Sequence, residues 1–195
     1  MLILREGSKV PFPEKLEEGY RIEDNQITAN IGADKIKSVL EHFIFIHNEQ
    51  LFFILELPAK QQEEIELFPG VVSSFHSDVY YIDGLSRQEA LRVLSIAGEL
   101  MIRDGMCTFG FGCHHSKEEI LFGKYNVTTI FSEEPDKYVP FFKAHQIEQK
   151  KNLVIAWNLF SPEHSGESIC VKTDGKTIYD IPFIFADWGI YKAQR

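Results

Sequence analysis

The sequence predicts an α+β domain, with a mainly antiparallel sheet built from hairpins and helices packed on one face. Short apolar runs of strand length recur along the chain, and segments with helical apolar spacing separate them. Aromatic residues make up 13% of the chain, including sixteen Phe, which favours strands and a bulky core. At 195 residues we expect a single domain over residues 1–195, with a possible division near residue 70 or residue 147.

In the first half of the chain, the pattern predicts one helix and three strands. Asn30 is expected to cap a short helix over residues 31–43. The aromatic run over residues 42–58 fits two strands folded at a turn at residues 47–50. A further strand is expected over residues 77–84, where an Asp-Gly pair closes it.

A longer helix follows this strand. Ser86 and Glu89 form an S-x-x-E capping box at its start. Apolar residues around Leu94 recur at helical spacing over a broad face, so we expect much of this helix to be buried. Asp104 and Gly105 end it, with Gly105 suited to the left-handed position after the last turn.

The segment DGMCTFGFGCHHSKEEILFG, residues 104–123, is predicted to be a strand that leads into a capped helix. Its first part alternates between two faces. The bulky face is expected to point to the core and contains Cys107, Phe109, Phe111 and Cys113. The other face leaves room for a neighbouring element or a ligand and contains Met106, Thr108, Gly110 and Gly112. Ser116 and Glu119 form a second capping box, for a short helix that Gly123 ends.

The last third of the chain is predicted to add strands and one helix to this arrangement. The expected elements are a strand over 125–132, a helix over 136–146, a strand over 152–160, a hairpin over 167–183 and an edge strand or tail over 184–192. Asp174 and Gly175 are expected to form the type I′ turn of the hairpin.

Cysteine usage and apolar run lengths indicate the compartment. The three cysteines, an odd number without a framework spacing, fit a reducing cytosol better than a disulfide-built secreted domain. The apolar run at the N-terminus is too short for the core of a signal peptide. No window approaches eighteen apolar residues. We therefore expect a cytoplasmic protein that does not bind a membrane.

The charge of the chain is unevenly placed. The formal net charge is −9, and all of the excess lies before residue 151, because the remaining residues hold equal numbers of acids and bases. An acidic chain is repelled by phosphate backbones, so we expect no nucleic-acid partner.

Four residues of the central segment have ligand atoms that suit zinc: Cys107, Cys113, His114 and His115. Their spacing does not match that of zinc sites, because neighbours on an extended strand point to opposite faces and paired C-x-x-C knuckles are absent. No dinucleotide or Walker motif is complete. We therefore expect no metal and no cofactor, although a site completed by His76, His145 or His164 stays open.

A thiol active site is the enzymatic alternative. Cys113 stands beside His114, ahead of the expected helix, where a thiol pKa can fall. Sequence neighbours on a strand diverge, however, so a buried and inert Cys113 is favoured. The alternative function is accordingly an enzyme of unrecognised type with a site around Cys113, His114 and His115.

The small, acidic, aromatic-rich profile is similar to that of many bacterial immunity and accessory proteins, which act by binding. We therefore expect a non-enzymatic cytoplasmic protein that binds a basic protein partner, and the sequence does not indicate the oligomeric state. The candidate contact residues are Glu17, Glu18, Glu63, Glu64, Glu133 and Glu134. A second alternative is a small-ligand binder with an apolar pocket over the glycine face of the strand at residues 106–113.

Overall fold

The computed structural model describes residues 2–59, 66–68, 71–72 and 76–194, and the side chains of 66–68 and 71–72 are not described. Its main feature is an eight-stranded antiparallel sheet with the strand order β12-β7-β4-β8-β9-β10-β3-β2. The strands are β2 (Gly19–Glu23), β3 (Gln26–Asn30), β4 (Leu51–Pro58), β7 (Ser77–Leu85), β8 (Thr108–Cys113), β9 (Glu118–Phe122), β10 (Val127–Phe131) and β12 (Tyr191–Lys192).

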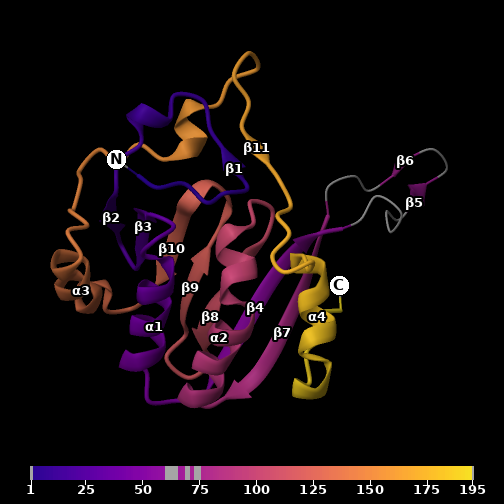
Figure 1. Cartoon of the computed structure of the whole chain (residues 1–195). Coiled ribbons are helices and arrows are strands. Elements are labelled where there is room, and N and C mark those ends of the chain that lie inside the picture. Colours follow the sequence, from indigo (N-terminus) through magenta and orange to yellow (C-terminus); the bar gives the residue numbers. More distant parts are fainter. Residues whose placement is uncertain (1, 60–65, 69–70, 73–75, 195) are drawn as a thin grey trace.

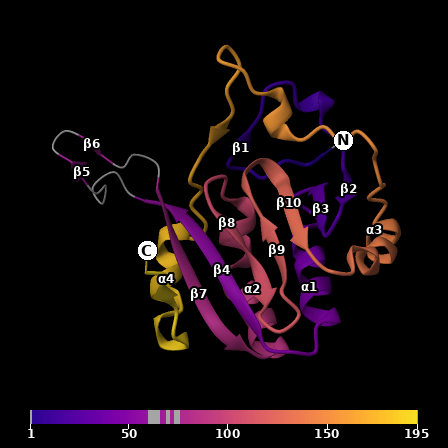
Figure 2. The same cartoon turned by 180° about the vertical axis from the view of Figure 1, so that it is seen from behind.

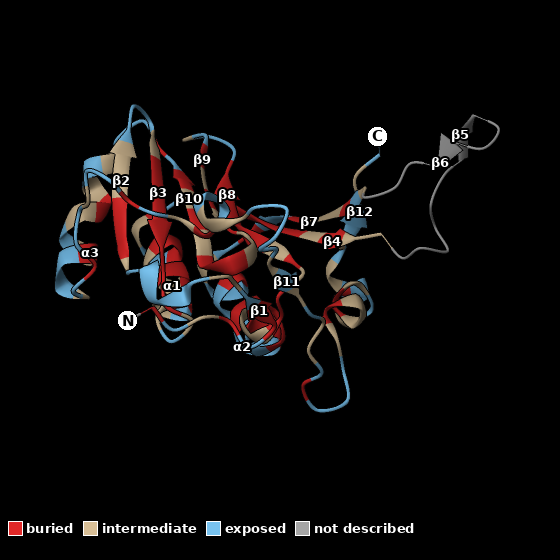
Figure 3. Ribbon diagram, turned by 90° about the horizontal axis from the view of Figure 1, so that it is seen from above, coloured by how far each residue is buried: buried red, intermediate tan, exposed pale blue. Residues whose placement is uncertain are grey.

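Two long helices cover one face of this sheet. In Figure 1, α1 (Ile36–Ile46) and α2 (Arg87–Arg103) lie in front of the central strands. In the reverse view the strands face the reader and no helix crosses them (Figure 2). Seen from above, the strands form one layer and both helices lie on the same side of it (Figure 3). The predicted α+β class, with helices on one face, is confirmed.

Shorter elements complete the fold. Two small two-stranded sheets pair β1 (Ser8–Lys9) with β11 (Glu167–Ser168) and β5 (Glu66–Phe68) with β6 (Val71–Val72). The short helices are η1 (Pro13–Lys15), η3 (Lys124–Asn126), η4 (Pro135–Tyr138), α3 (Val139–Ala144), η5 (Ala156–Leu159), η6 (Ile178–Asp180), α4 (Ile181–Ile184) and η7 (Ala186–Trp188).

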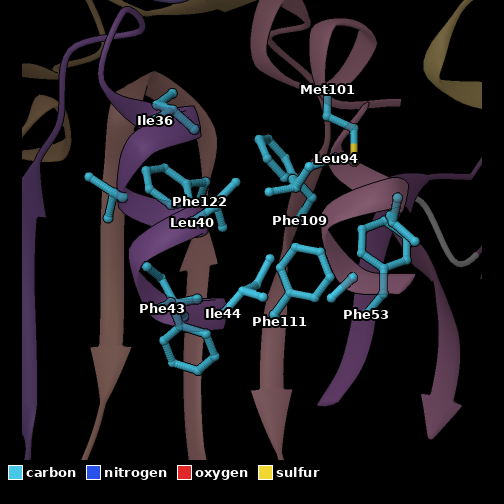
Figure 4. Packing of buried hydrophobic residues seen from close by; sticks show 14 of the residues in the cluster. Ile36, Leu40, Phe43, Ile44, Phe53, Leu94, Met101, Phe109, Phe111 and Phe122 are labelled. Carbon is cyan, nitrogen blue, oxygen red and sulfur yellow. The ribbon is translucent and has the colours of Figure 1, made fainter. Parts of the chain in front are cut away.

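The strand register separates apolar from polar side chains. Because successive side chains point to opposite faces, one cross-strand row faces the helices and the next faces away. A central row on the helix side is apolar in every strand that it crosses: Ile22, Ile27, Ile130, Ile120, Phe111, Phe53 and Ile82. Figure 4 shows Phe111 and Phe122 of the sheet among Leu40 and Ile44 of α1. This packing is the core of the protein.

The helix predicted after Ser86 is confirmed as α2. The Ser86 Oγ accepts a hydrogen bond from the Glu89 amide, and the Glu89 carboxylate accepts one from the Ser86 amide, at 2.8 Å. The expected left-handed Gly105 is wrong, because its φ is not positive. Gly105 instead allows close approach of the main chain at Gly7, where a Cβ would overlap.

The prediction of two strands over residues 42–58 is half wrong. Residues 51–58 form β4, but residues 42–46 continue α1, which ends at His47. Aromatic and β-branched residues favour strands locally, yet Phe43 and Ile44 follow the helical spacing of the face that packs on the sheet, and this packing prevails. Asn30 belongs to β3 and does not cap this helix.

The short helix predicted after Ser116 is wrong. Residues 118–122 form β9, which pairs with β8 as a hairpin. Glu118, Ile120 and Phe122 are buried and alternate with half-buried positions at a period of two, and Lys117 supplies the positive φ, 57°, that the tight turn needs. An S-x-x-E motif therefore does not mark a helix here.

The C-terminal third is less regular than predicted. The strand at 125–132 and the helix at 136–146 correspond to β10 and to η4 with α3. The strand predicted over 152–160 is wrong, because these residues form η5 and pack on a small second core. The turn at Asp174 and Gly175 is confirmed with both φ values positive, but residues 178–184 are helical. The expected edge strand exists as β12.

Arg5 is a fully buried cation at the end of α2. Its guanidinium donates to the carbonyl oxygens of Met101 (2.6 Å), Ile102 (3.3 Å), Cys107 (3.3 Å) and Gly123 (2.9 Å). Two of these carbonyls belong to the last turn of α2, whose dipole favours a positive charge. Arg5 therefore takes over the role of a helix cap and joins the N-terminal segment to the sheet.

The first prediction concerns α2. Leu94 is buried against the sheet, so Leu94→Ala should lower the free energy of unfolding by about 2–5 kcal/mol. Ser86→Ala removes one cap and should lower it by about 1 kcal/mol. Chemical denaturation measures both, and a Leu94→Ala midpoint equal to that of the parent would show that Leu94 does not belong to the core.

The second prediction concerns Arg5. Arg5→Met leaves several buried carbonyls without donors, and each costs about 1–3 kcal/mol. The free energy of unfolding should therefore fall by at least about 3 kcal/mol. Arg5→Lys should recover only part of this, because one ammonium cannot reproduce the planar fork. If Arg5→Met changes stability by under about 0.5 kcal/mol in chemical denaturation, the proposed capping role is wrong.

Candidate functional site

The face of the sheet opposite α1 and α2, here called the open face, is the candidate site. Its side chains come from seven consecutive strands and from β12 at the edge. They are Arg21, Glu23, Gln26, Thr28, Phe52, Ile54, Glu56, Tyr81, Asp83, Thr108, Glu119, Leu121, Thr129, Phe131 and Tyr191, with Gly110 and Gly112 between them. Antiparallel sheets often leave one face to solvent, and on this face Glu23, Asp83, Phe131 and Tyr191 are exposed, whereas Thr28, Phe52 and Ile54 are buried.

The two glycines of β8 form a recess that the protein itself fills. The ring of Phe52 lies on Gly112, where a Cβ would overlap the ring atoms. A Cβ on Gly110 would overlap the main-chain oxygen of Ile120. The predicted glycine face therefore exists, and neighbouring strands occupy the space that it leaves.

Aromatic rings gather beside this recess. The centroid of the Phe52 ring lies 4.6 Å from that of His114 and 6.0 Å from that of Tyr81. The ring centroids of Tyr81 and Tyr191 are 6.0 Å apart. Asp83 accepts hydrogen bonds from the Tyr191 hydroxyl at 2.6 Å and from His114 Nε2 at 3.1 Å. Burial acts to raise the pKa of Asp83, but these two hydrogen bonds outweigh it and hold that pKa below its usual value.

Two further carboxylates of the open face have no cationic partner among the described residues. Within the described residues, no ion pair includes Glu56 or Glu119. Burial raises the pKa of Glu119, and repulsion from Glu56 adds to it. Burial also raises the pKa of Tyr81, and the carboxylates of Glu119, Glu56 and Asp83 reinforce that shift. The centre of the open face is therefore a region of negative potential.

The structure does not bring the predicted thiol and imidazoles together. Cys113 faces the helices and is buried, which raises its pKa to about 12, with the Glu49 carboxylate contributing. His114 lies on the open face with 73% of its side chain exposed. His115 is exposed on the turn, where its amide donates to Glu49 at 3.0 Å. Because the side chains diverge, the enzymatic alternative has no assembled site here.

Other ligand residues are also scattered. In the part of the chain that the structure describes, no three His, Cys, Asp or Glu side chains form a group that could hold a metal ion. His145 stacks on Phe141 beside α1, and His164 contacts Phe12 near the second small core. His76 lies next to the Asp78 carboxylate, at 3.9 Å.

The structure reveals a buried polar network that the sequence analysis missed. The Glu118 carboxylate accepts hydrogen bonds from His47 Nε2 (2.8 Å), Lys137 Nζ (2.5 Å) and the Tyr138 hydroxyl (2.9 Å). His47 Nδ1 donates to the Phe43 carbonyl at 2.7 Å. Burial acts to raise the pKa of Glu118, but these donors outweigh it and lower that pKa. Since every oxygen of the carboxylate has a partner, the network joins α1, β9 and η4.

The predicted partner-binding acids do not form one patch. Glu17 pairs with Lys150, and Glu18 pairs with Lys35 at 2.6 Å, at one end of β2. Glu63 and Glu64 lie outside the described residues. Glu133 and Glu134 are exposed at the other end of β2, where the Ser132 amide donates to the Asn25 carbonyl. Here they adjoin further exposed acids, and we name this group the acidic edge: Glu23, Asp24, Glu133, Glu134 and Asp136.

A shallow groove of about 420 Å³ crosses the end of the open face farthest from the acidic edge. Met106 and Thr108 of the predicted glycine face line it, together with Glu56, Lys124 and Trp157. The expected pocket was apolar, whereas this groove has both charges on its walls, and Gly110 and Gly112 do not line it.

Sequence reasoning missed the open face for two reasons. Glu119 was assigned to a helix, so its place on a sheet face beside Phe131 was hidden. The alternation of Glu118, Ile120 and Phe122 with Glu119 was the available signal. The approach of Tyr191 to Asp83 joins residues 108 positions apart, and no local pattern predicts it.

Comparisons with protein-family models, curated proteins and solved structures find no match for this chain. Among the described residues, no helix is both long and apolar enough to cross a bilayer.

The third prediction concerns the thiols. Burial raises the pKa values of Cys107 and Cys113 to about 12 and that of the half-buried Cys170 to about 11, so all three are protonated at pH 8. The exposure of each thiol to solvent should then determine how fast it reacts, so Cys170 should react first with a disulfide reagent. Cys107 and Cys113 should react only after unfolding. The absorbance of the thiolate that the reagent releases measures the reaction. Rapid labelling of Cys113 in the native protein would restore the enzymatic alternative.

Proposed function

We propose that this chain is a non-enzymatic binding protein that captures a protein partner with a basic surface. The supporting observation is the acidic edge, where five exposed carboxylates lie at the β2–β3 turn and the segment after β10. Among the described residues, the one ion pair of the acidic edge joins Glu23 to Arg21, at 3.4 Å. Charge of one sign on an exposed surface attracts a partner of the opposite sign and speeds encounter.

The buried network supports this proposal because it fixes the acidic edge in place. Lys137 and Tyr138 follow directly after Asp136 and bind the buried Glu118. The segment that bears Glu133 and Glu134 is therefore anchored on the sheet. A partner that meets an ordered surface loses less free energy to ordering than one that meets a flexible tail.

The biological setting is part of the proposal. We place the protein in the bacterial cytoplasm, in an immunity or accessory role in which a basic protein such as a toxin is the partner of the acidic edge. Nucleic acid does not fit the acidic edge, because phosphates and carboxylates repel each other. Because Cys113 and His114 point to opposite faces of the sheet, the binding function is preferred to the enzymatic alternative.

The fourth prediction tests this function. Glu133→Lys combined with Glu134→Lys should slow capture of the partner from the native host while leaving the free energy of unfolding nearly unchanged, because exposed charges contribute little to stability. Raising the salt concentration should lower the on-rate more than the off-rate, since salt screens charges over about 8–10 Å. Pull-downs washed at low and high salt, followed by surface kinetics, measure both effects.

The matched control is Glu14→Lys combined with Glu163→Lys, which makes the same change in net charge at exposed sites elsewhere. The control should bind normally. Equal weakening by the two double variants would show a general charge effect. Failure to recover any partner at low salt, together with turnover in an unbiased activity screen, would contradict the binding function.

A further inference from the structure

We propose that the open face continues the acidic edge and is the docking surface for an extended, arginine-bearing segment of the partner. This inference depends on the proposed function, since it assigns the chemistry and the spacing of the contact. Neither α1 nor α2 lies on the open face (Figure 2), and η5 borders only its far end, through Trp157.

The strand register makes the two surfaces continuous. One cross-strand row begins in the acidic edge and runs over the open face to β7: Glu23, Gln26, Phe131, Glu119, Gly112 and Phe52, with Asp83 next across a bulge. His114 contacts both Phe52 and Asp83, so Phe52 and Asp83 lie side by side. The row therefore joins an acidic rim to an aromatic centre.

The negative charges of the open face favour a partner that presents a cation. Glu119 has no cationic partner among the described residues, and its burial and the nearby Glu56 disfavour its charge. Among the described strand residues of the open face, Arg21 is the one arginine or lysine, and it contacts Glu23; Lys124 lies with Glu56 on the groove at the far end. A cation placed over Glu119 would relieve the repulsion between the two carboxylates.

The rings on the same face favour arginine over lysine. Phe131 is 42% exposed and Tyr191 is 48% exposed, and both stand near carboxylates of the row. A guanidinium is planar, stacks on aromatic rings and binds a carboxylate through two parallel hydrogen bonds, whereas an ammonium is a compact and strongly hydrated charge. The combination of rings and carboxylates therefore fits arginine.

The spacing of the carboxylates predicts the spacing of the arginines. Glu23 and Glu119 are three strands apart, and so are Glu119 and Asp83. At about 4.8 Å per strand, each gap is roughly 14 Å, which is close to four residues of an extended chain at about 3.4 Å each. Arginines at positions 1, 5 and 9 of an extended segment therefore match the three carboxylates and point to the same side.

The test uses three labelled nine-residue peptides with serine at all remaining positions. The first has arginines at positions 1, 5 and 9, the second has arginines at positions 1, 2 and 3, and the third has lysines at 1, 5 and 9. Fluorescence anisotropy with the full chain at low salt measures each Kd. We expect the first peptide to bind about tenfold more tightly than the other two, because only it matches spacing and shape.

Two variants assign the binding to the open face. Glu119→Gln keeps the shape of a half-buried side chain and should weaken the first peptide about tenfold. Glu14→Gln removes the same charge from an exposed site away from the sheet and should leave the Kd unchanged. Circular dichroism of both variants confirms that they are folded.

Several outcomes would overturn the inference. They are equal binding of the three peptides, no binding of the first peptide, or equal effects of Glu119→Gln and Glu14→Gln. Capture of the host partner that is lost with Glu133→Lys and Glu134→Lys but kept with Glu119→Gln would also overturn it. That last result leaves the proposed function standing, because the partner would then bind the acidic edge alone.

Discussion

The buried guanidinium of Arg5 is the interaction on which the arrangement of the sheet depends. A charge in the interior is tolerated only with hydrogen-bond partners, and Arg5 finds them in carbonyl groups of α2, of the residue before β8 and of Gly123 after β9. Asp104 is buried close by and accepts bonds from the amides of Met106 and Cys107. The turn between α2 and β8 therefore has one geometry, which sets the starting point of β8.

This starting point decides which face each residue of β8 joins. A shift of one residue would move Phe109 and Phe111 to solvent and the glycines to the core. With the observed register, Gly112 accepts the ring of Phe52, and Phe109 and Phe111 are buried on the helix side. The composition of the open face is thus a consequence of the way in which the N-terminal segment and α2 meet.

Structural features that depend on neighbours in sequence could be predicted, whereas features that depend on contacts between distant residues could not. The capping box at Ser86 and the alternation of β8 depend on neighbours in sequence, so both were predictable. The helical state of residues 42–46 depends on packing against the sheet, and the strand state of 118–122 depends on pairing with β8 and β10. The exposure of the acids at 133–134 could be predicted from their charge, whereas the neighbours of Glu119 across the strands of the open face could not.

Buried charge also explains why the acidic edge can be ordered. Exposed carboxylates repel one another, so the segment at 133–136 would gain from moving away from the β2–β3 turn. Glu118 opposes this, because separating it from Lys137 and Tyr138 would leave a carboxylate in the interior without two of its donors. The buried hydrogen bonds of Glu118 therefore hold the mutually repelling carboxylates of the acidic edge in place. Such a surface is stabilised further when a cationic partner neutralises it, which is the condition that a binding protein requires.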